Sequence, residues 1–260
     1  MKVEPFHVSK SIALKIKNAT TTTLRYSTFL SMSKDSVQSI LMLLKCCTRE
    51  KDLCKGHRMH EDILKRRLLK KSIYIGTALV DLYAKCGALS KAQLVFDELP
   101  TQNVVSWTAL IGGYAQYGHG EKALSCFEKM QQKGLSPDAL TYVCILKACS
   151  SIKDAQKGSE IHAEIVKHGM LGNDSVLGTA LVDMYVKCGA FAKAQQVFDV
   201  LPIQNIVSWN VLISGYFTFT AAFSWGNGVC FVTGIVDRIL LDDVNYEIIE
   251  KDIYSLTNLN

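Results

Sequence analysis

Residues 73–107 read IYIGTALVDLYAKCGALSKAQLVFDELPTQNVVSW, and residues 175–209 read SVLGTALVDMYVKCGAFAKAQQVFDVLPIQNIVSW. At a fixed offset of 102 residues, 24 of these 35 aligned positions are identical, and no gap is needed. The same offset places Gly56 over Gly158 and His60 over His162 further upstream. Self-similarity at a fixed period is typical of proteins built from stacked repeats, so this repetition decides the fold.

The period of 102 residues is too long for one helical repeat, and turn-forming residues divide it into three. These residues are Asn103, Pro137-Asp138, Asn173-Asp174 and Asn205, and they delimit repeats of 35, 36 and 31 residues. We therefore expect a basic N-terminal segment (1–36), a repeat array and a divergent tail (217–260). The array comprises residues 37–72, 73–103, 104–138, 139–174, 175–205 and a partial repeat, 206–216.

Each repeat has the pattern of two helices joined by a turn. In residues 73–103, apolar residues recur at helical spacing before Gly87, which is placed to end the first helix. A second apolar stripe follows and runs to Pro100, and in the next repeat Ser106 is the expected N-cap of the first helix. One such hairpin cannot bury its apolar face alone. We therefore predict an all-α protein, a right-handed α-solenoid of stacked helix-turn-helix repeats.

The composition excludes several other classes of protein. The chain has 260 residues, of which 48% are hydrophobic and 20% charged, and its 4 Pro and 17 Gly are too few for collagen-like or Gly/Pro-rich disordered chains. Nine cysteines lack the spacing of a disulfide framework, which predicts free thiols. The net charge of +5 arises in residues 1–72, which hold 16 basic and 6 acidic side chains, whereas residues 73–205 hold 11 and 12. The basic run at 65–71 is either a solvated helix face or a sequence-independent phosphate contact.

The two ends of the chain carry targeting and membrane signals. Residues 1–36 are basic, rich in Ser and Thr and poor in acids, as in an organellar transit peptide, although a disordered basic terminus has the same composition. We expect a mitochondrial location, with the chloroplast as the alternative. Residues 217–236 carry no charge, which permits a transmembrane segment. Three glycines, Asn227 and several hydroxyls in that run oppose it, so we expect no stable membrane insertion.

Short strings within the repeats carry a resemblance to a known family. The third complete repeat has VSWTALI at 105–111 and GLSPD at 134–138, the fourth has ILKAC at 145–149, and the fifth has ALVDMY at 180–185. Over residues 37–216 the chain resembles plant pentatricopeptide repeat proteins, in the subclass that alternates standard, long and short repeats. The resemblance implies binding of single-stranded organellar RNA and, for this subclass, cytidine-to-uridine editing. Because neither further repeats nor a deaminase-like domain follows residue 216, we expect a truncated member.

In this family, the fifth and the last residue of a repeat read one base. Helical-repeat RNA readers use two or three side chains per base, and hydroxyl, amide and carboxylate groups differ in what they donate and accept. By resemblance, the pairs and their expected bases are Thr77 with Asn103 for adenine, Thr108 with Asp138 for guanine, Thr179 with Asn205 for adenine, and Asn210 alone for a pyrimidine.

The long repeats depart from this pattern. Their fifth residues, Leu41 and Val143, are apolar and cannot hydrogen-bond a base edge, and their last residues are Ser72 and Asp174. We expect these repeats to act as spacers. The second residues of the other repeats resemble those that sandwich bases in the family, although packing between repeats is an equally good explanation. They are Tyr74, Val105, Val176 and Val207.

No catalytic or metal site is predicted. His162-Ala163-Glu164 matches half of a zinc deaminase signature, but the Pro-Cys-x-x-Cys half is absent, and Cys46, Cys47, Cys54, His57 and His60 contain no C-x-x-C pair. We expect no enzyme activity and no cofactor. The expected partners are single-stranded organellar RNA and editing proteins supplied in trans, with a monomeric chain. A protein-binding solenoid is one alternative, because Trp107, Leu110 and Tyr114 fit three tetratricopeptide positions, and a non-functional truncated family member is the other.

Overall fold

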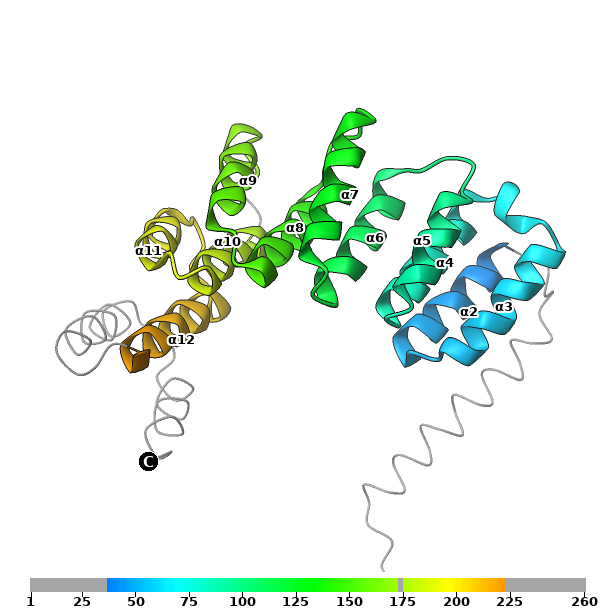
Figure 1. Ribbon diagram of the computed structural model, residues 1–260, viewed down its shortest axis with the longest axis horizontal. Coiled ribbons are helices and arrows are strands. Elements are labelled where there is room, and N and C mark those ends of the chain that lie inside the picture. Colours follow the sequence, from blue (N-terminus) through cyan, green and yellow to red (C-terminus); the bar gives the residue numbers. More distant parts are fainter. Residues whose placement is uncertain (1–36, 173–174, 223–260) are drawn as a thin grey trace, which may run out of the picture. The chain divides into compact units, whose positions relative to one another are not determined.

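The computed structural model describes residues 37–172 and 175–222, and these residues form helices without strands. They belong to two compact units, which divide between Gln102 and Asn103 (Figure 1). The first unit contains α2 (Val37–Glu50), α3 (Leu53–Lys65), a 3-10 turn (Leu68–Lys70), α4 (Ile73–Lys85) and α5 (Leu89–Asp97). The second contains α6 (Val104–Gln116), α7 (Gly120–Gln132), α8 (Ala139–Ile152), α9 (Ala155–Lys167), α10 (Ser175–Lys187), α11 (Phe191–Val200) and α12 (Ile206–Ala222).

The helices stack in one recurring way within each compact unit. In the second unit, α6, α8, α10 and α12 pack one against the next, and α7, α9 and α11 each pack on the helices before and after them in sequence (Figure 1). In the first unit, α2 packs on α4, α3 contacts both, and α5 covers α4. Each repeat therefore contributes a first helix to a continuous row and a second helix beside it, as predicted from the apolar stripes.

Glycines in the left-handed conformation separate the two helices of several repeats. Gly87, Gly118 and Gly189 have φ angles of 78°, 78° and 77°, which L side chains rarely adopt. The amide that follows Gly87 donates to the Tyr83 carbonyl oxygen at 2.9 Å and so satisfies the end of α4. This confirms the prediction that Gly87 ends the first helix.

Aromatic side chains lie at the centre of several of the hairpins. Tyr83, Tyr142 and Tyr185 are fully buried from the first helices, and phenylalanines pack from the second ones. The Tyr185 hydroxyl lies 3.1 Å from His162 Nδ1, and Lys193 Nζ lies 5.8 Å from the centre of the Tyr185 ring. Tyr83 has equivalent contacts with His60 and Lys91 in the first unit. Because these contacts recur at the offset of 102 residues, the histidine that resembled a deaminase ligand is a packing residue in both units.

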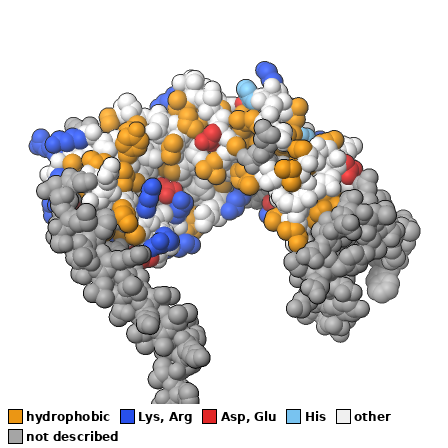
Figure 2. Space-filling view, turned by 180° about the vertical axis from the view of Figure 1, so that it is seen from behind, with side chains coloured by type: hydrophobic (Ala, Val, Ile, Leu, Met, Phe, Trp, Pro, Cys, Tyr) orange, Lys and Arg blue, Asp and Glu red, His pale blue; other side chains and the backbone are white. Residues whose placement is uncertain are grey.

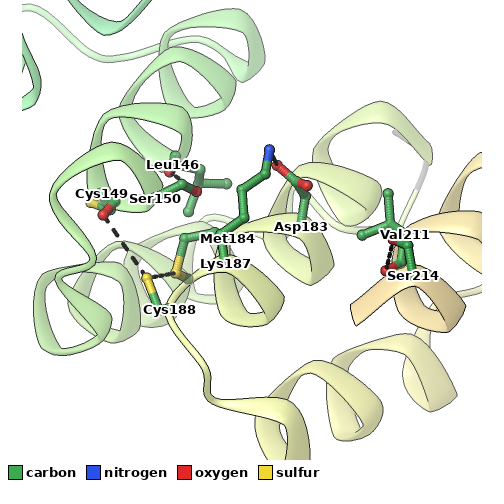
Figure 3. Close-up of polar contacts among 9 residues, drawn as sticks. All are labelled: Leu146, Cys149, Ser150, Asp183, Met184, Lys187, Cys188, Val211 and Ser214. Carbon is green, nitrogen blue, oxygen red and sulfur yellow. Dashed lines mark hydrogen bonds and ion pairs between the residues drawn. The ribbon is translucent and has the colours of Figure 1, made fainter. Parts of the chain in front are cut away.

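Small and sulfur-containing residues fill the space between successive first helices. Cys188 Sγ, at the end of α10, lies 3.9 Å from the Cys149 carbonyl oxygen on α8 and 3.9 Å from Met184 Sδ (Figure 3). Burial raises the pKa of the Cys149 thiol to about 12, which makes it unreactive. The eight cysteines in the described residues are free thiols, as predicted.

Several sequence predictions fall on residues outside this description. The N-terminal segment 1–36 and residues 223–260 of the tail lie there, as does most of the uncharged run 217–236, of which only the first six residues lie in α12. Within the described residues, none of the helices combines the length and the apolar character needed to cross a membrane.

Gly178 lies on α10 where the helix meets the end of its own hairpin. A Cβ atom there would clash with Leu201 Cδ2 and lie 3.2 Å from Leu201 Cδ1. We expect Gly178→Ala to lower the free energy of unfolding by about 1–3 kcal/mol, because overpacking displaces a buried leucine. Urea unfolding followed by circular dichroism measures the change. Gly172→Ala is the matched control, since no atom lies within 4 Å of its Cβ position. Equal effects of the two changes would contradict this explanation.

The half-buried histidines predict a pH dependence of stability. Burial lowers the pKa values of His60 and His162 below 6.5, and the charge of Lys193 adds to the effect at His162. The unfolded chain therefore binds these protons at a higher pH than the folded chain does, so stability falls as the pH decreases below about 6.5. We expect the melting temperature to fall less between pH 7.5 and pH 5.5 in the His60→Gln/His162→Gln variant than in the parent chain. The same fall in both proteins would exclude these side chains as the cause.

Candidate nucleic-acid interface

The last residue of three repeats caps the first helix of the repeat that follows. Asn103 Oδ1 accepts the Ser106 amide hydrogen at 2.9 Å, Asp138 Oδ1 accepts that of Thr141 at 2.8 Å, and Asn205 Oδ1 accepts that of Ser208 at 2.9 Å. The first amides of a helix have no partner within the helix, and these side chains satisfy one of them in each case. The three predicted last-position residues thus lie at the N-termini of α6, α8 and α12.

The prediction that Ser106 is the N-cap of α6 is wrong. Asn103 is the N-cap, and Ser106 is the third residue of the helix, where its hydroxyl accepts the Asn103 amide hydrogen at 3.1 Å. Both halves of a capping box are present. Asn and Ser are comparably good caps, so the sequence alone left two choices three residues apart.

Capping fixes which group of each side chain is left for another partner. Only the amide oxygen can accept a backbone N–H, so Asn103 and Asn205 retain Nδ2 as a donor. Asp138 retains Oδ2, which as part of a carboxylate can only accept. Asp138 is exposed, and the two asparagines are half-buried. The caps therefore present a donor at two places and an acceptor at the third.

The fifth residues lie one turn into the first helices. The hydroxyls of Thr108 and Thr179 donate to the carbonyl oxygens of Val104 and Ser175, at 2.8 and 2.7 Å. A threonine whose hydrogen is used in this way has oxygen lone pairs left and acts as an acceptor. Thr179 lies on α10, which packs against α12, the helix that Asn205 caps.

The pair of Thr108 and Asp138 is joined by a third residue. Thr141 Oγ1 lies 2.6 Å from Asp138 Oδ1 and 2.7 Å from Thr108 Oγ1. Both contacts are short enough for O–H···O hydrogen bonds. The structure therefore brings this predicted pair together.

The remaining predicted site residues differ in their surroundings. Thr77 is buried on α4, and its Oγ1 has no hydrogen-bond partner among the described residues. It belongs to the first compact unit, whereas Asn103 begins the second. Asn210 is exposed on α12. In the long repeats, Leu41 and Val143 are half-buried and Ser72 precedes α4 without a side-chain cap bond, while Asp174 lies outside the described residues.

The second residues of the repeats are exposed apolar side chains. Their exposed fractions lie between 56% and 69%, which excludes burial between repeats as the reason for their apolar character. One of them, Leu140, was not predicted, because the fourth repeat was treated as a spacer; its register in the sequence would have identified it. In the second compact unit this exposed apolar row comprises Val105, Leu140, Val176 and Val207, and Tyr74 holds the equivalent position in the first unit.

Basic charge does not dominate the surface around these residues. Lys and Arg side chains form separate groups on the face shown in Figure 2. Lys85 pairs with Asp81 at 3.0 Å and Lys187 with Asp183 at 2.7 Å, so two lysines of the first helices are partly neutralised. Within the described part of the chain, no three His, Cys, Asp or Glu side chains are placed to hold a metal ion.

Models of known protein families match two segments of the sequence. Residues 77–104 match a model of the PPR repeat, and residues 102–151 match a model of the PPR repeat family. The chain contains pentatricopeptide repeats. This confirms the resemblance for the repeats themselves.

Plant proteins with pentatricopeptide repeats are similar to the chain over most of its length. It is 40% identical over 177 residues to the Arabidopsis thaliana pentatricopeptide repeat-containing protein At4g18520, chloroplastic. The aligned segment covers 68% of this chain and 28% of that protein. It is 38% identical over 174 residues to At3g09040, mitochondrial, from the same plant, covering 67% and 17%. The chain thus spans less than a third of the length of these relatives.

The fold is similar to that of solved pentatricopeptide repeat structures. The crystal structure of PPR10 in complex with an 18-nt psaJ RNA element superposes with a TM-score of 0.67 at 18% identity, over 87% of this chain and 33% of that one. The structure of PPR10 from maize gives 0.55 at 21% identity, over 86% and 32%. These likenesses confirm the predicted all-α solenoid class.

Asp138 offers a test of capping that is independent of any ligand. We expect Asp138→Ala to lower the free energy of unfolding by about 1 kcal/mol, because α8 loses the acceptor for its Thr141 amide. Asp138→Asn is the matched control, since an asparagine oxygen can accept the same hydrogen. Thermal unfolding of the two variants gives the comparison. Equal losses of stability in both variants would mean that negative charge, and not the cap bond, is what α8 requires.

Proposed function

We propose that the repeats at 37–216 bind single-stranded RNA in a sequence-specific manner. One observation carries the proposal: Asn103, Asp138 and Asn205 each use one oxygen to cap a helix and retain one group of defined character, and the second residue of each of these helices is an exposed apolar side chain. Defined donors and acceptors can read base edges, and exposed side chains can contact base faces.

The pair of Thr108 and Asp138 suits guanine. Thr108 has lone pairs left after its hydroxyl hydrogen is used, and Asp138 retains Oδ2, so the pair offers two acceptors. The Watson–Crick edge of guanine carries two adjacent donors, N1–H and the N2 amino group. Adenine presents one donor and one acceptor there and leaves an acceptor of the pair unmatched.

The pair of Thr179 and Asn205 suits adenine. Thr179 acts as an acceptor because its hydrogen is donated to Ser175, and Asn205 retains Nδ2 as a donor. These match the N6 amino group and N1 of adenine. We assign the same preference to Thr77 with Asn103 from the equivalent residue types, and a pyrimidine to Asn210.

The exposed apolar row gives the bases a surface to pack on. Stacking on a side chain tolerates every base, because each base has a flat apolar face. Leu140 extends this row into the fourth repeat, whose fifth residue, Val143, cannot read an edge. We propose that a base opposite this repeat is held without being identified.

We further propose that the chain acts on organellar transcripts, in the mitochondrion or, alternatively, the chloroplast. Relatives named for each organelle support this and do not separate the two. We also assign the chain, by resemblance, to the subclass with standard, long and short repeats, and this assignment implies cytidine-to-uridine editing with the catalytic component supplied in trans. The chain would then select the site and leave the chemistry to its partner.

A solenoid that binds only proteins is the alternative function. The residues that match tetratricopeptide positions, Trp107, Leu110 and Tyr114, are buried between helices. They therefore report how helical hairpins pack and do not indicate a ligand. The two functions differ in one measurable way, because a purely protein-binding solenoid retains no RNA even at low salt.

The test uses filter binding of the full chain to RNAs that contain A-G-x-A-pyrimidine. We expect the guanine-containing RNA to bind about tenfold more tightly than the same RNA with adenine at that position, since one satisfied edge is worth about 1.4 kcal/mol. In Asp138→Asn the preference at this base should shift toward adenine, because Nδ2 replaces Oδ2 while the cap bond remains. Equal binding of matched and scrambled RNA would refute sequence-specific reading, and no retention at low salt would refute RNA binding.

A further inference from the structure

Thr141 differs from the equivalent residues of the neighbouring repeats. It is the third residue of α8, as Ser106 is of α6 and Ser208 of α12. The Ser106 and Ser208 hydroxyls both donate to the backbone carbonyl oxygen of the cap residue, at 2.8 Å. The Thr141 hydroxyl instead contacts two side chains, Asp138 Oδ1 at 2.6 Å and Thr108 Oγ1 at 2.7 Å.

The hydrogens of this cluster can be assigned. A carboxylate has no hydrogen to give, so Thr141 must donate to Asp138. The Thr141 oxygen then accepts, and the hydrogen of Thr108 is shared between Thr141 Oγ1 and the Val104 carbonyl oxygen at 2.8 Å. Asp138 Oδ1 thus receives two hydrogens, from the amide and the hydroxyl of Thr141. Both hydroxyl hydrogens are thus used within the cluster, and neither is left to donate to a ligand.

We propose that Thr141 is a positioning residue for the guanine reader formed by Thr108 and Asp138. This inference rests on the proposed function. Two bonds from one residue fix the rotation of the Asp138 carboxylate and leave Oδ2 as its acceptor, while the contact with Thr108 keeps that hydroxyl in the acceptor state. Thr141 is fully buried and therefore acts through these two side chains.

The residue types at these two positions correlate at every complete repeat, whereas the side-chain contact itself is described at Thr141. A hydroxyl-bearing third residue follows each repeat whose fifth residue is threonine, and an aliphatic third residue follows each repeat whose fifth residue is aliphatic. The polar cases are Thr77 before Ser106, Thr108 before Thr141 and Thr179 before Ser208, and the aliphatic cases are Leu41 before Ile75 and Val143 before Leu177. The long repeat 139–174 thus contributes to reading by its third residue, although its own fifth residue, Val143, is apolar.

The experiment compares Thr141→Val with Thr141→Ser in the full chain. Valine keeps the branched shape and the backbone cap bond but removes the hydroxyl, whereas serine keeps the hydroxyl. We expect Thr141→Val to lose most of the roughly tenfold preference for guanine over adenine at this base while other bases of the RNA are read as before. Thr141→Ser should retain the preference. Ser208→Ala is the matched control, because that hydroxyl bonds only the backbone, and it should leave the choice of base unchanged.

Base preference separates positioning from a purely structural effect. Thr141→Val in the Asp138→Ala background should change the preference no further, because two residues that act through one contact are not additive. If Thr141→Val weakens all RNAs by one factor, or leaves the guanine preference intact, this inference is wrong while RNA reading stands. If the parent chain shows no base preference at this position, the proposed function fails first and the inference fails with it.

Discussion

The hydrogen bond from a first-turn amide to the last side chain of the preceding repeat is the interaction on which the structure most depends. In the second compact unit it starts α6, α8 and α12, the helices that line the continuous row. The same bond limits which hydrogen-bonding group of each side chain faces outward, because it commits one oxygen to the helix and leaves the other end of the group free to turn to a base. Each carboxylate or amide group therefore serves both folding and the proposed recognition. One oxygen caps a helix, and the other oxygen or the nitrogen is the group proposed to contact a base.

In the proposed function, this division is what allows side chains so close to the backbone to discriminate between bases. A free asparagine can turn its amide over and present either a donor or an acceptor, and so distinguishes little. Once the oxygen of Asn205 is held at 2.9 Å by the Ser208 amide, the turned-over state costs a helix cap. Specificity then comes from preorganisation, with the stability of the helix holding the reader in place.

The sequence predicted the helical class and the turn at Gly87, because these follow from local patterns. It marked Asn103, Asp138 and Asn205 as turn and base-reading residues but not as helix caps. It did not predict that Asn103 and not Ser106 caps α6, since both types are good caps. The contact between Thr141 and Thr108 could not be predicted from the sequence either. These residues are 33 positions apart and meet only when α6 and α8 pack. The exposed apolar position of Leu140 could have been predicted, because Leu140 is the second residue of its repeat, as Val105 and Val207 are of theirs.

Charge sets a limit on how this surface can hold a nucleic acid. Residues 73–205 contain 11 basic and 12 acidic side chains, and exposed lysines such as Lys187 are shared with aspartates. Affinity that comes from phosphate contacts scales with the number of cations released and disappears with added salt. Because basic and acidic side chains are nearly equal in number in these repeats, the phosphate source is weak, and in the proposed function contacts with base edges and faces supply most of the binding free energy. Such a protein depends on each reading pair, and loss of one pair weakens binding at that base without compensation from the backbone.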